Sequence, residues 1–483
     1  MITFVISLFV LIAGYFIYGR MVEKWFGIDE STETPALKMA DGIDYVAMPE
    51  WRIFMVQFLN IAGIGPIFGA ILGAMYGPAA FLWIVFGCIF AGGVHDYFSG
   101  MLSCRHDGIS IPEVVGRYLG NGFKQFMRAF SVILLLLVGV VFILSPAKII
   151  SGLTGDVLSF SALSTQDALL IFIFAYYILA TLLPIDKIIG KIYPFFGAAL
   201  LIMAAGLAVA MVVLHAPIPE LTTATLTNMH SEPGKYPLYP LLFITIACGA
   251  LSGFHATQSP MMARCITNER QGRRIFYGAM IAEGIIALIW AAASMSFFNN
   301  TAGLNTALAE HGNNAAWVVN EVCNSWLGKA GGLLAILGVV ACPITSGDTA
   351  FRSARLIIAD FTNLCQKRVR NRLLITLPLF AAAWLITRMD FGIIWRYFGF
   401  ANQTLATIVL WTAGMYMMKW GKNHWIATLP ALFMTAVCST YILIAPEGFR
   451  LGTGIAYPAG IAVAAAALII FLKKGKSHER SIL

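Results

Sequence analysis

The sequence predicts an all-α polytopic membrane protein with about 13 transmembrane helices, arranged around a core of two inverted five-helix repeats. Composition is the first observation: 59% of the 483 residues are hydrophobic and only 12% are charged, against about 25% charged in a soluble domain. The second is a series of apolar stretches of roughly 20 residues, the length that crosses about 30 Å of hydrocarbon. The third is the position of polar interruptions within those stretches.

The apolar stretches divide the chain into four regions. A first span and a cytoplasmic loop occupy residues 1–50, the first repeat 51–215, the second repeat 238–418, and two further spans with a basic tail 419–483. The predicted spans are 2–18, 51–75, 79–102, 127–150, 167–184, 190–215, 238–263, 275–297, 331–351, 372–388, 391–418, 424–444 and 453–472.

Lysines and arginines provide an independent check on the spans, because cytoplasmic segments of membrane proteins are enriched in them. Most of the 32 lie in alternate segments, beginning with the one that follows the first span. This pattern predicts an N-terminus outside the cytoplasm and a C-terminus inside it. The net charge of +8 is thereby explained by orientation in a lipid bilayer, and no nucleic-acid partner is expected.

The chain shows no pattern typical of an enzyme. Its eight cysteines lack the spacing of a metal site, and we interpret them as small buried helix residues. The Gly63-x-Gly65 pair belongs to no strand–helix unit and does not predict dinucleotide binding. The sequence therefore predicts a protein that is not an enzyme and has no cofactor.

Three spans contain glycine, proline and small polar residues near the middle of the membrane, where an unwound backbone is tolerated only if it lines a cavity enclosed by protein. The first reads Gly63-Ile64-Gly65-Pro66, and we interpret it as a break in the helix. Glycines 65, 69, 73 and 77 also form an i, i+4 row. Close helix packing alone explains that row.

The other two interruptions lie in the second half of the chain. The seventh span contains a small, polar segment that runs from Cys248 to Pro260, and the ninth contains Ala341 to Thr349, with two hydroxyls followed by Asp348. A buried hydroxyl commonly bonds a carbonyl of its own helix. Asp348 can likewise form an ordinary ion pair with Arg352, four residues further on.

Counted from the second span, the interruptions fall in the first, sixth and eighth core spans, so the first two open two successive sets of five spans. An odd number of spans per set inverts the second set in the membrane. The arrangement resembles the leucine-transporter-type fold of sodium-coupled carriers. A more specific resemblance, to the carbon starvation protein A (CstA) family, is carried most densely by the first hundred residues. Its segments are GYFIYGR (14–20), FGID (26–29), TPA (34–36), DGIDYV (41–46), QFLNIAGIGPI (57–67) and VHDY (94–97).

The family resemblance implies a carrier of the bacterial inner membrane, in the amino acid, polyamine and organocation superfamily. It also implies that the transported small molecule is pyruvate or a short peptide. This chain is shorter than the long members of the family, which carry further C-terminal helices. We favour pyruvate, with a peptide transporter of the same fold as the alternative and a membrane sensor or channel as the second alternative.

The resemblance to sodium-coupled carriers implies a sodium site built from carbonyl and hydroxyl oxygens. In this chain, the residues with the spacing of the sodium ligands of those carriers are Cys342, Thr345 and Ser346 in the ninth span. The carbonyls of Leu59 and Ala62, just before the first break, would complete the site. The competing interpretation is proton coupling through Asp348, Asp96 or His95, because a buried ionisable residue is a functional candidate by default. The coupling ion is therefore sodium or a proton.

The substrate is expected between the first two breaks, where helix N-termini present N–H groups to a carboxylate. His255 is a substrate or proton-transfer candidate, with a purely structural role given equal weight. His95 and Asp96 are expected to bond one another in a gating or structural role; a metal site with His255 is the alternative. The predicted substrate contacts are Gln57, Asn60, Gly63, Gly65, Ser252, Gly253, His255, Thr257, Gln258 and Ser259.

A carrier is favoured over the other classes of membrane protein by the paired breaks. A channel would show a repeated filter segment, and a sensor would carry a cytosolic module, neither of which we find in the sequence. The outer segments 216–237 and 298–330 are expected to be loops that act as lids.

Overall fold

The structure is a computed structural model that describes residues 1–42, 45–154, 164–182, 186–362, 364 and 368–479. The described residues form helices and no strand, which confirms the predicted all-α membrane class. Within them, nine helices are long and apolar enough to cross a membrane, and one bent pair makes a tenth candidate. The count of 13 spans, the inverted repeat and the four-region division stay predictions.

The long helices and helix pairs follow the predicted spans in order. Their bounds are α1 Ile2–Phe26, α3 Glu50–Ile61, α4 Ile64–Gly73, α5 Ala79–Phe86, α6 Gly93–Arg105, α8 Asn121–Thr154, α9 Thr165–Leu182, α10 Asp186–Val213, α11 Leu238–Thr245, α12 Gly253–Ala263, α13 Gly278–Phe297, α16 Cys342–Thr362, α17 Val369–Ile386, α18 Phe391–Lys419, α19 Trp425–Ile444 and α20 Thr453–Glu479. Shorter or connecting helices are α2 Pro35–Lys38, α7 Ile111–Leu119, α14 Thr301–Glu310 and α15 Ala315–Ala335, with π-helical turns at Gly87–Gly92, Arg273–Tyr277 and Ile336–Ala341.

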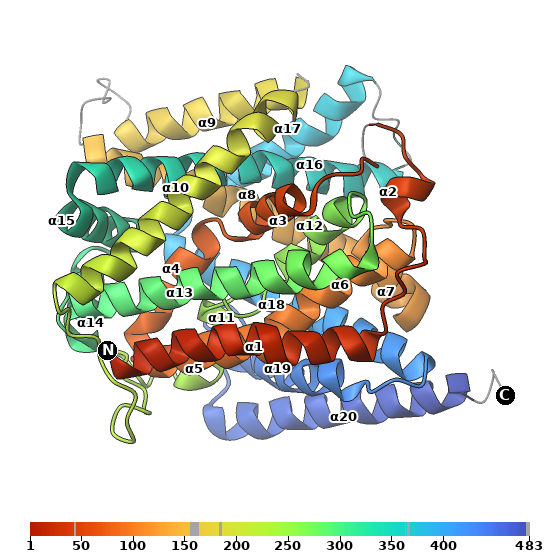
Figure 1. The fold of residues 1–483 in the computed structure, drawn as a ribbon. Helices are drawn as coiled ribbons and strands as arrows, with labels where there is room; N and C mark the ends of the chain where they lie inside the picture. The colour runs from red at the N-terminus through yellow and green to blue at the C-terminus, as the bar shows by residue number, and fades with distance from the viewer. Residues whose placement is uncertain (43–44, 155–163, 183–185, 363, 365–367, 480–483) are drawn as a thin grey trace.

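The helices run side by side in one bundle, with the N-terminus at one end and the C-terminus near the other (Figure 1). In this view α1, α19 and α20 lie along one side of the bundle, and α9, α16 and α17 lie along the opposite side. The broken helices α3–α4 and α11–α12 lie between these two layers. Exposed apolar side chains gather on α1, α9 and α20, as expected for helices that face lipid.

The first predicted break is present between α3 and α4, which meet at an angle of 47°. Gly63 leaves the helical conformation there, and Pro66 sits in the first turn of α4, where its missing N–H costs no helix bond. A Cβ on Gly65 would approach the Cys248 side chain to 2.6 Å. The glycine row therefore packs α4 against the second broken helix, as the sequence pattern predicts.

The second predicted break separates α11 from α12 over residues 246–252. Gly249 has a φ of +91°, which L side chains rarely adopt, so the turn requires glycine. Two glycines of the π-helical turn before α6 lie against this segment, because a Cβ on Gly92 would reach the Ala250 carbonyl oxygen at 2.2 Å. Contact of this kind holds the unwound segment against the π-helical turn that precedes α6.

The prediction that the ninth span is interrupted is wrong, because residues 342–362 form the continuous helix α16. The helix runs from Ala315 to Ala359, so it passes through Pro343 without ending there. A π-helical turn at Ile336–Ala341 precedes α16. The outer segment 298–330 is likewise not a loop, since α14 and the first part of α15 fill most of it.

Candidate functional site

A charged cluster of four fully buried residues lies where the second break meets its neighbours. It consists of His95 and Asp96 from α6, His255 from α12 and Glu283 from α13. His95 and Asp96 lie in the first turn of α6, after the π-helical turn Gly87–Gly92, and turns of this kind are frequent at functional sites. Charged residues at this depth are costly and must compensate one another.

Asp96 joins the two histidines of the cluster. Its Oδ1 lies 2.7 Å from Nδ1 of His95, and its Oδ2 lies 2.8 Å from Nδ1 of His255. A carboxylate accepts hydrogen bonds, so we assign the ring proton to Nδ1 in both histidines. The predicted bond between His95 and Asp96 is thereby confirmed, and His255 joins the same group.

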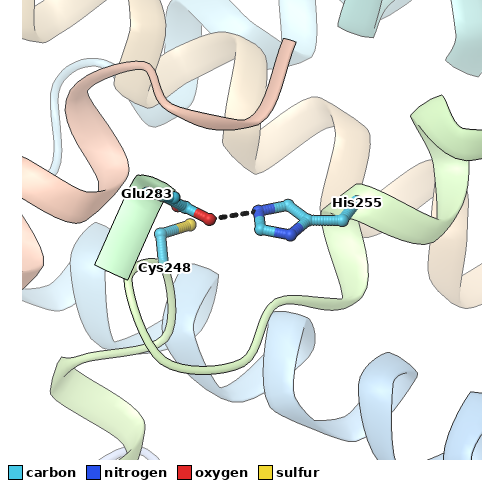
Figure 2. A group of neighbouring side chains, drawn as sticks. All are labelled: Cys248, His255 and Glu283. Carbon is cyan, nitrogen blue, oxygen red and sulfur yellow. Dashed lines mark ion pairs between the residues drawn. The ribbon is translucent and has the colours of Figure 1, made fainter. Parts of the chain in front are cut away.

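His255 and Glu283 face each other through their remaining atoms (Figure 2). Nε2 of His255 lies 3.4 Å from Oε2 of Glu283, and neither atom has another hydrogen-bond partner among the described residues. Without a proton between them, two lone pairs would oppose one another in a dry environment. The contact is therefore suited to holding one proton, either on the imidazole or on the carboxyl group.

Glu283 connects this proton position to the unwound backbone. Its Oε1 accepts a hydrogen bond of 3.1 Å from the Gly249 N–H, inside the α11–α12 break. Cys88 of the neighbouring π-helical turn donates to the Gly249 carbonyl over 2.9 Å. A change in the charge of Glu283 thus acts directly on the backbone of the broken helix.

Cys248 completes the group drawn in Figure 2. Donor atoms of Cys248, His255 and Glu283 all lie within 4.8 Å of one another, close enough to surround a small cation. The Cys248 sulfur also lies 3.5 Å from the Ser252 hydroxyl and 3.5 Å from the Asn402 amide. These contacts join Cys248 to the hydrogen-bonded groups at the second break.

Asn402 of α18 caps the N-terminus of α12. Its Oδ1 accepts 2.7 Å from the Phe254 N–H and 3.1 Å from the Ser252 hydroxyl. A Cβ on Gly253 would meet the Asn402 carbonyl oxygen at 2.4 Å. The predicted substrate contacts Ser252 and Gly253 are thus in contact with α18, and a substrate carboxylate would have to compete with the cap.

Three further predicted substrate contacts form hydrogen bonds to residues of α12 and α6. Thr257 donates to the Phe254 carbonyl over 2.7 Å, and the Gln258 amide donates to the Thr257 hydroxyl over 2.9 Å. Ser259 donates to the His255 carbonyl over 2.9 Å and accepts from Ser99 of α6 over 3.0 Å. These groups consequently stabilise α12 and its contact with α6.

Gln57 of α3 differs from the other candidates. It is fully buried, and both polar atoms of its amide lack a hydrogen-bond partner among the described residues. Burying such a group without partners costs about 1–3 kcal/mol, so it is the predicted contact that most needs a ligand. Asn60 lies buried one turn further on, and Gly63 lies against the ring of Phe142 from α8.

The predicted sodium residues fall on two elements. Leu59 lies in the last turn of α3, Ala62 directly follows that helix, and both are fully buried. Ser346 of α16 is buried as well. The side chains of Cys342 and Thr345 lie outside the described residues. The sodium site stays a prediction. Asp348 makes the expected ion pair with Arg352 over 3.1 Å.

A cavity of about 370 Å³ opens at the end of the bundle that holds the N-terminus. It is bordered by α4, α11 and α18 and by the loop that precedes α11, and it reaches Thr245 at the start of the second break. His230 lies in its wall against the rings of Tyr76 and Tyr236. Burial lowers the pKa of His230 to about 4, which keeps its imidazole uncharged at neutral pH.

The opposite end of the bundle is crosslinked by charged groups. Arg105 donates from Nε and Nη2 to the two oxygens of Glu269, each over 2.8 Å, and also bonds Tyr416. Its guanidinium lies 4.0 Å from the ring centroid of Phe26. These contacts join α1, α6 and α18 and the turn before α13 at this end.

Sequence reasoning missed Glu283 and Asn402. Glu283 is the lone acid in the otherwise apolar run 278–297, and an isolated intramembrane carboxylate is the signal that would have identified it. Asn402 follows Phe400 and Ala401 in a span rich in apolar residues. Its role as a cap depends on a contact between residues 148 positions apart.

Comparison with known proteins gives a consistent result. The family model described as "Carbon starvation protein CstA" matches residues 1–154, 151–330 and 318–441. An uncharacterised membrane protein of Haemophilus influenzae is 49% identical over 64% of this chain and 94% of its own length. The peptide transporter CstA of Bacillus subtilis is 26% identical over 91% of this chain and 89% of its own length.

Two further comparisons extend this result. The pyruvate/proton symporter BtsT of Escherichia coli (strain K12) is 24% identical over 91% of this chain and 80% of its own length. A solved nucleobase-cation-symport-1 family transporter in a closed conformation shares the fold, with a TM-score of 0.53 and 13% identity. That match covers 88% of this chain and 92% of the other.

Proposed function

Because this chain belongs to the carbon starvation protein CstA family, whose named relatives are membrane transporters, we propose that it imports a small carboxylate, with pyruvate favoured, by proton symport. The observation that carries the proposal is the contact between His255 and Glu283 at the second break, which suits the binding of one proton. The resemblance of the chain to a pyruvate/proton symporter supports both the substrate and the ion.

The charged cluster supplies a physical route from proton binding to movement. A proton shared by His255 and Glu283 holds α12 against α13, and its loss leaves two facing lone pairs that repel. Glu283 also holds the Gly249 N–H, so this repulsion reaches the unwound backbone between α11 and α12. Asp96 keeps His255 in place through Nδ1 whether or not Nε2 carries the proton.

The substrate site of the proposal lies at the first break, where α4 begins. Gln57 supplies an amide that can donate to a carboxylate or keto oxygen, and the N-terminal turn of α4 adds backbone dipoles that favour an anion. The cavity beside Thr245 offers the approach from the end of the bundle that we assign to the periplasm, on the distribution of lysine and arginine.

Uptake of labelled pyruvate by the purified protein in liposomes tests the proposal. An inward proton gradient is expected to drive accumulation, and an inward sodium gradient alone is not. The double variant Thr345→Ala/Ser346→Ala should leave proton-driven uptake in place. Sodium-driven uptake that this variant abolishes would instead establish the sodium site, and failure of pyruvate to enter under either gradient would refute the substrate.

Short peptides are the second candidate substrate, because the Bacillus subtilis relative is named a peptide transporter. A peptide carries the same carboxylate as pyruvate, but it also needs an acceptor for its ammonium group. Competition of unlabelled di- and tripeptides with labelled pyruvate distinguishes the two substrates. Peptide uptake without pyruvate uptake would transfer the proposal to peptides.

Replacement of Gln57 by leucine is expected to raise the KM for pyruvate about tenfold without lowering Tm, because the amide has no partner to lose until substrate binds. Gln403→Leu is the matched control, since that amide donates to the Phe243 carbonyl over 2.9 Å and its loss should lower Tm. Transport kinetics and thermal unfolding are the two measurements. An unchanged KM for Gln57→Leu would remove Gln57 from the substrate site.

A further inference from the structure

Three side chains with metal-binding donor atoms converge at the second break. They are the thiol of Cys248, the imidazole of His255 and the carboxyl group of Glu283, and Figure 2 shows them pointing toward one another. All three are buried, and their donor atoms lie within 4.8 Å of one another. In the part of the chain that the structure describes, no other three histidine, cysteine or acidic side chains meet in this way.

The spacing of these donor atoms suits a tetrahedral ion. Zn²⁺ binds nitrogen and oxygen ligands at about 2.0–2.2 Å and cysteine sulfur at about 2.3 Å, so two ligands of a tetrahedral site lie roughly 3.3–3.6 Å apart. The distance from Nε2 of His255 to Oε2 of Glu283 is 3.4 Å. Neither atom has a hydrogen-bond partner among the described residues, so an ion between them would displace no hydrogen bond.

The remaining atoms of the imidazole and the carboxyl group are held as those of metal ligands usually are. Nδ1 of His255 lies 2.8 Å from Oδ2 of Asp96, and a ligating histidine almost always donates its other ring N–H to a carboxylate, a carbonyl or water. Oε1 of Glu283 accepts from the Gly249 N–H over 3.1 Å, which leaves Oε2 for an ion. These bonds orient both ligands before any ion binds.

We propose that Cys248, His255 and Glu283 form a binding site for a divalent cation of the Zn²⁺ type. A set of thiolate, imidazole and carboxylate favours Zn²⁺ over Mg²⁺ or Ca²⁺, which prefer oxygen ligands alone, and water can supply the fourth ligand. The Cys248 thiol releases its proton when it coordinates, so two negative ligands balance the charge of the ion. The Asn402 amide, 3.5 Å from the Cys248 sulfur, can donate to the thiolate.

The ion and the proposed coupling proton share one position, between His255 and Glu283. This consequence rests on the proposed function, and it predicts that Zn²⁺ inhibits proton-driven uptake. The ion approaches from the outer cavity, whose wall includes Thr245, just before the break that contains Cys248. The site is buried in this structure, so the ion enters when the segment 246–252 moves.

Binding of Co²⁺ to the chelator-treated protein, purified in detergent without a histidine tag, tests the site independently of transport. The wild type is expected to show a thiolate-to-cobalt charge-transfer band and the visible bands of a tetrahedral site, and Zn²⁺ should displace the Co²⁺. Cys248→Ser should abolish the charge-transfer band and weaken Zn²⁺ binding at least about tenfold. Cys323→Ser, at another fully buried cysteine, should match the wild type. A wild type without the band, or equal loss in both variants, would overturn the proposal.

Two further measurements separate the metal site from misfolding and from the proposed function. Zn²⁺ should raise the Tm of the wild type, because it binds the folded protein, and Cys248→Ser should lose this rise while its Tm without metal shows that it is folded. A rise of equal size in Cys248→Ser would refute Cys248 as a ligand. In liposomes, the cobalt signature without inhibition of uptake by Zn²⁺ would support the metal site and refute the coupling proton at the same position.

Discussion

Replacement of Asp96 by asparagine is expected to abolish proton-driven accumulation of pyruvate. Asp96 accepts from Nδ1 of both His95 and His255, and asparagine offers one acceptor together with an amide that donates. Removing one member of a buried charged group costs about 3–5 kcal/mol, which corresponds to more than about a hundredfold in an equilibrium. Uptake into liposomes under an inward proton gradient measures the loss.

Two companion variants decide what a loss in Asp96→Asn means. Asp167→Asn makes the same chemical change in a surface ion pair with Arg388 and should transport normally. Asp348→Asn tests the competing coupling site on α16. If Asp348→Asn loses accumulation while Asp96→Asn keeps it, the charged cluster is not the coupling site. A size-exclusion profile and Tm show whether Asp96→Asn remains folded.

Replacement of Glu283 by glutamine is expected to separate substrate exchange from proton coupling. The amide can donate to Nε2 of His255 and accept from the Gly249 N–H, so both contacts of Glu283 are preserved. Glutamine cannot release a proton, however. Exchange of labelled for unlabelled pyruvate should therefore continue, whereas accumulation against a gradient should fall to that of protein-free liposomes.

The pH dependence provides the second measurement on this variant. Wild-type uptake should change between about pH 5 and pH 8, the range in which a histidine commonly titrates, and Glu283→Gln should flatten that dependence. Glu113→Gln is the control, since Glu113 pairs with Lys124 and Arg128 and lies outside the cluster. A proton gradient that still drives accumulation in Glu283→Gln would place the coupling proton elsewhere.

Some features of the site follow from the sequence without the fold. His95, Asp96 and His255 are identified because an ionisable residue in an apolar stretch costs free energy of insertion and is usually functional. The breaks at Gly63 and Gly249 follow from glycine and proline, whose effects on the backbone are local. The third predicted interruption is wrong because the helix continues through the π-helical turn Ile336–Ala341 and past Pro343, and sequence alone does not reveal whether a helix continues through a proline.

Other features depend on contacts between distant segments. The sequence suggested substrate residues on the basis of polarity and proximity to a break. Only the folded protein shows which of these side chains already have a hydrogen-bond partner and which do not. Thr257 and Ser259 bond carbonyls of their own helix, whereas the amide of Gln57 has no hydrogen-bond partner among the described residues. Sequence cannot make this distinction, because it depends on what packs against each side chain.

Composition and the spacing of glycine, proline and basic residues were enough to predict a helical membrane protein with broken helices, because bilayer thickness and backbone hydrogen bonding restrict each segment by itself. The pairing of His255 with Asp96 and Glu283 and the cap from Asn402 were decided by the tertiary structure. In a dry interior a charged or polar group must find its partner on whichever helix lies beside it. That neighbour is set by the packing of the whole bundle.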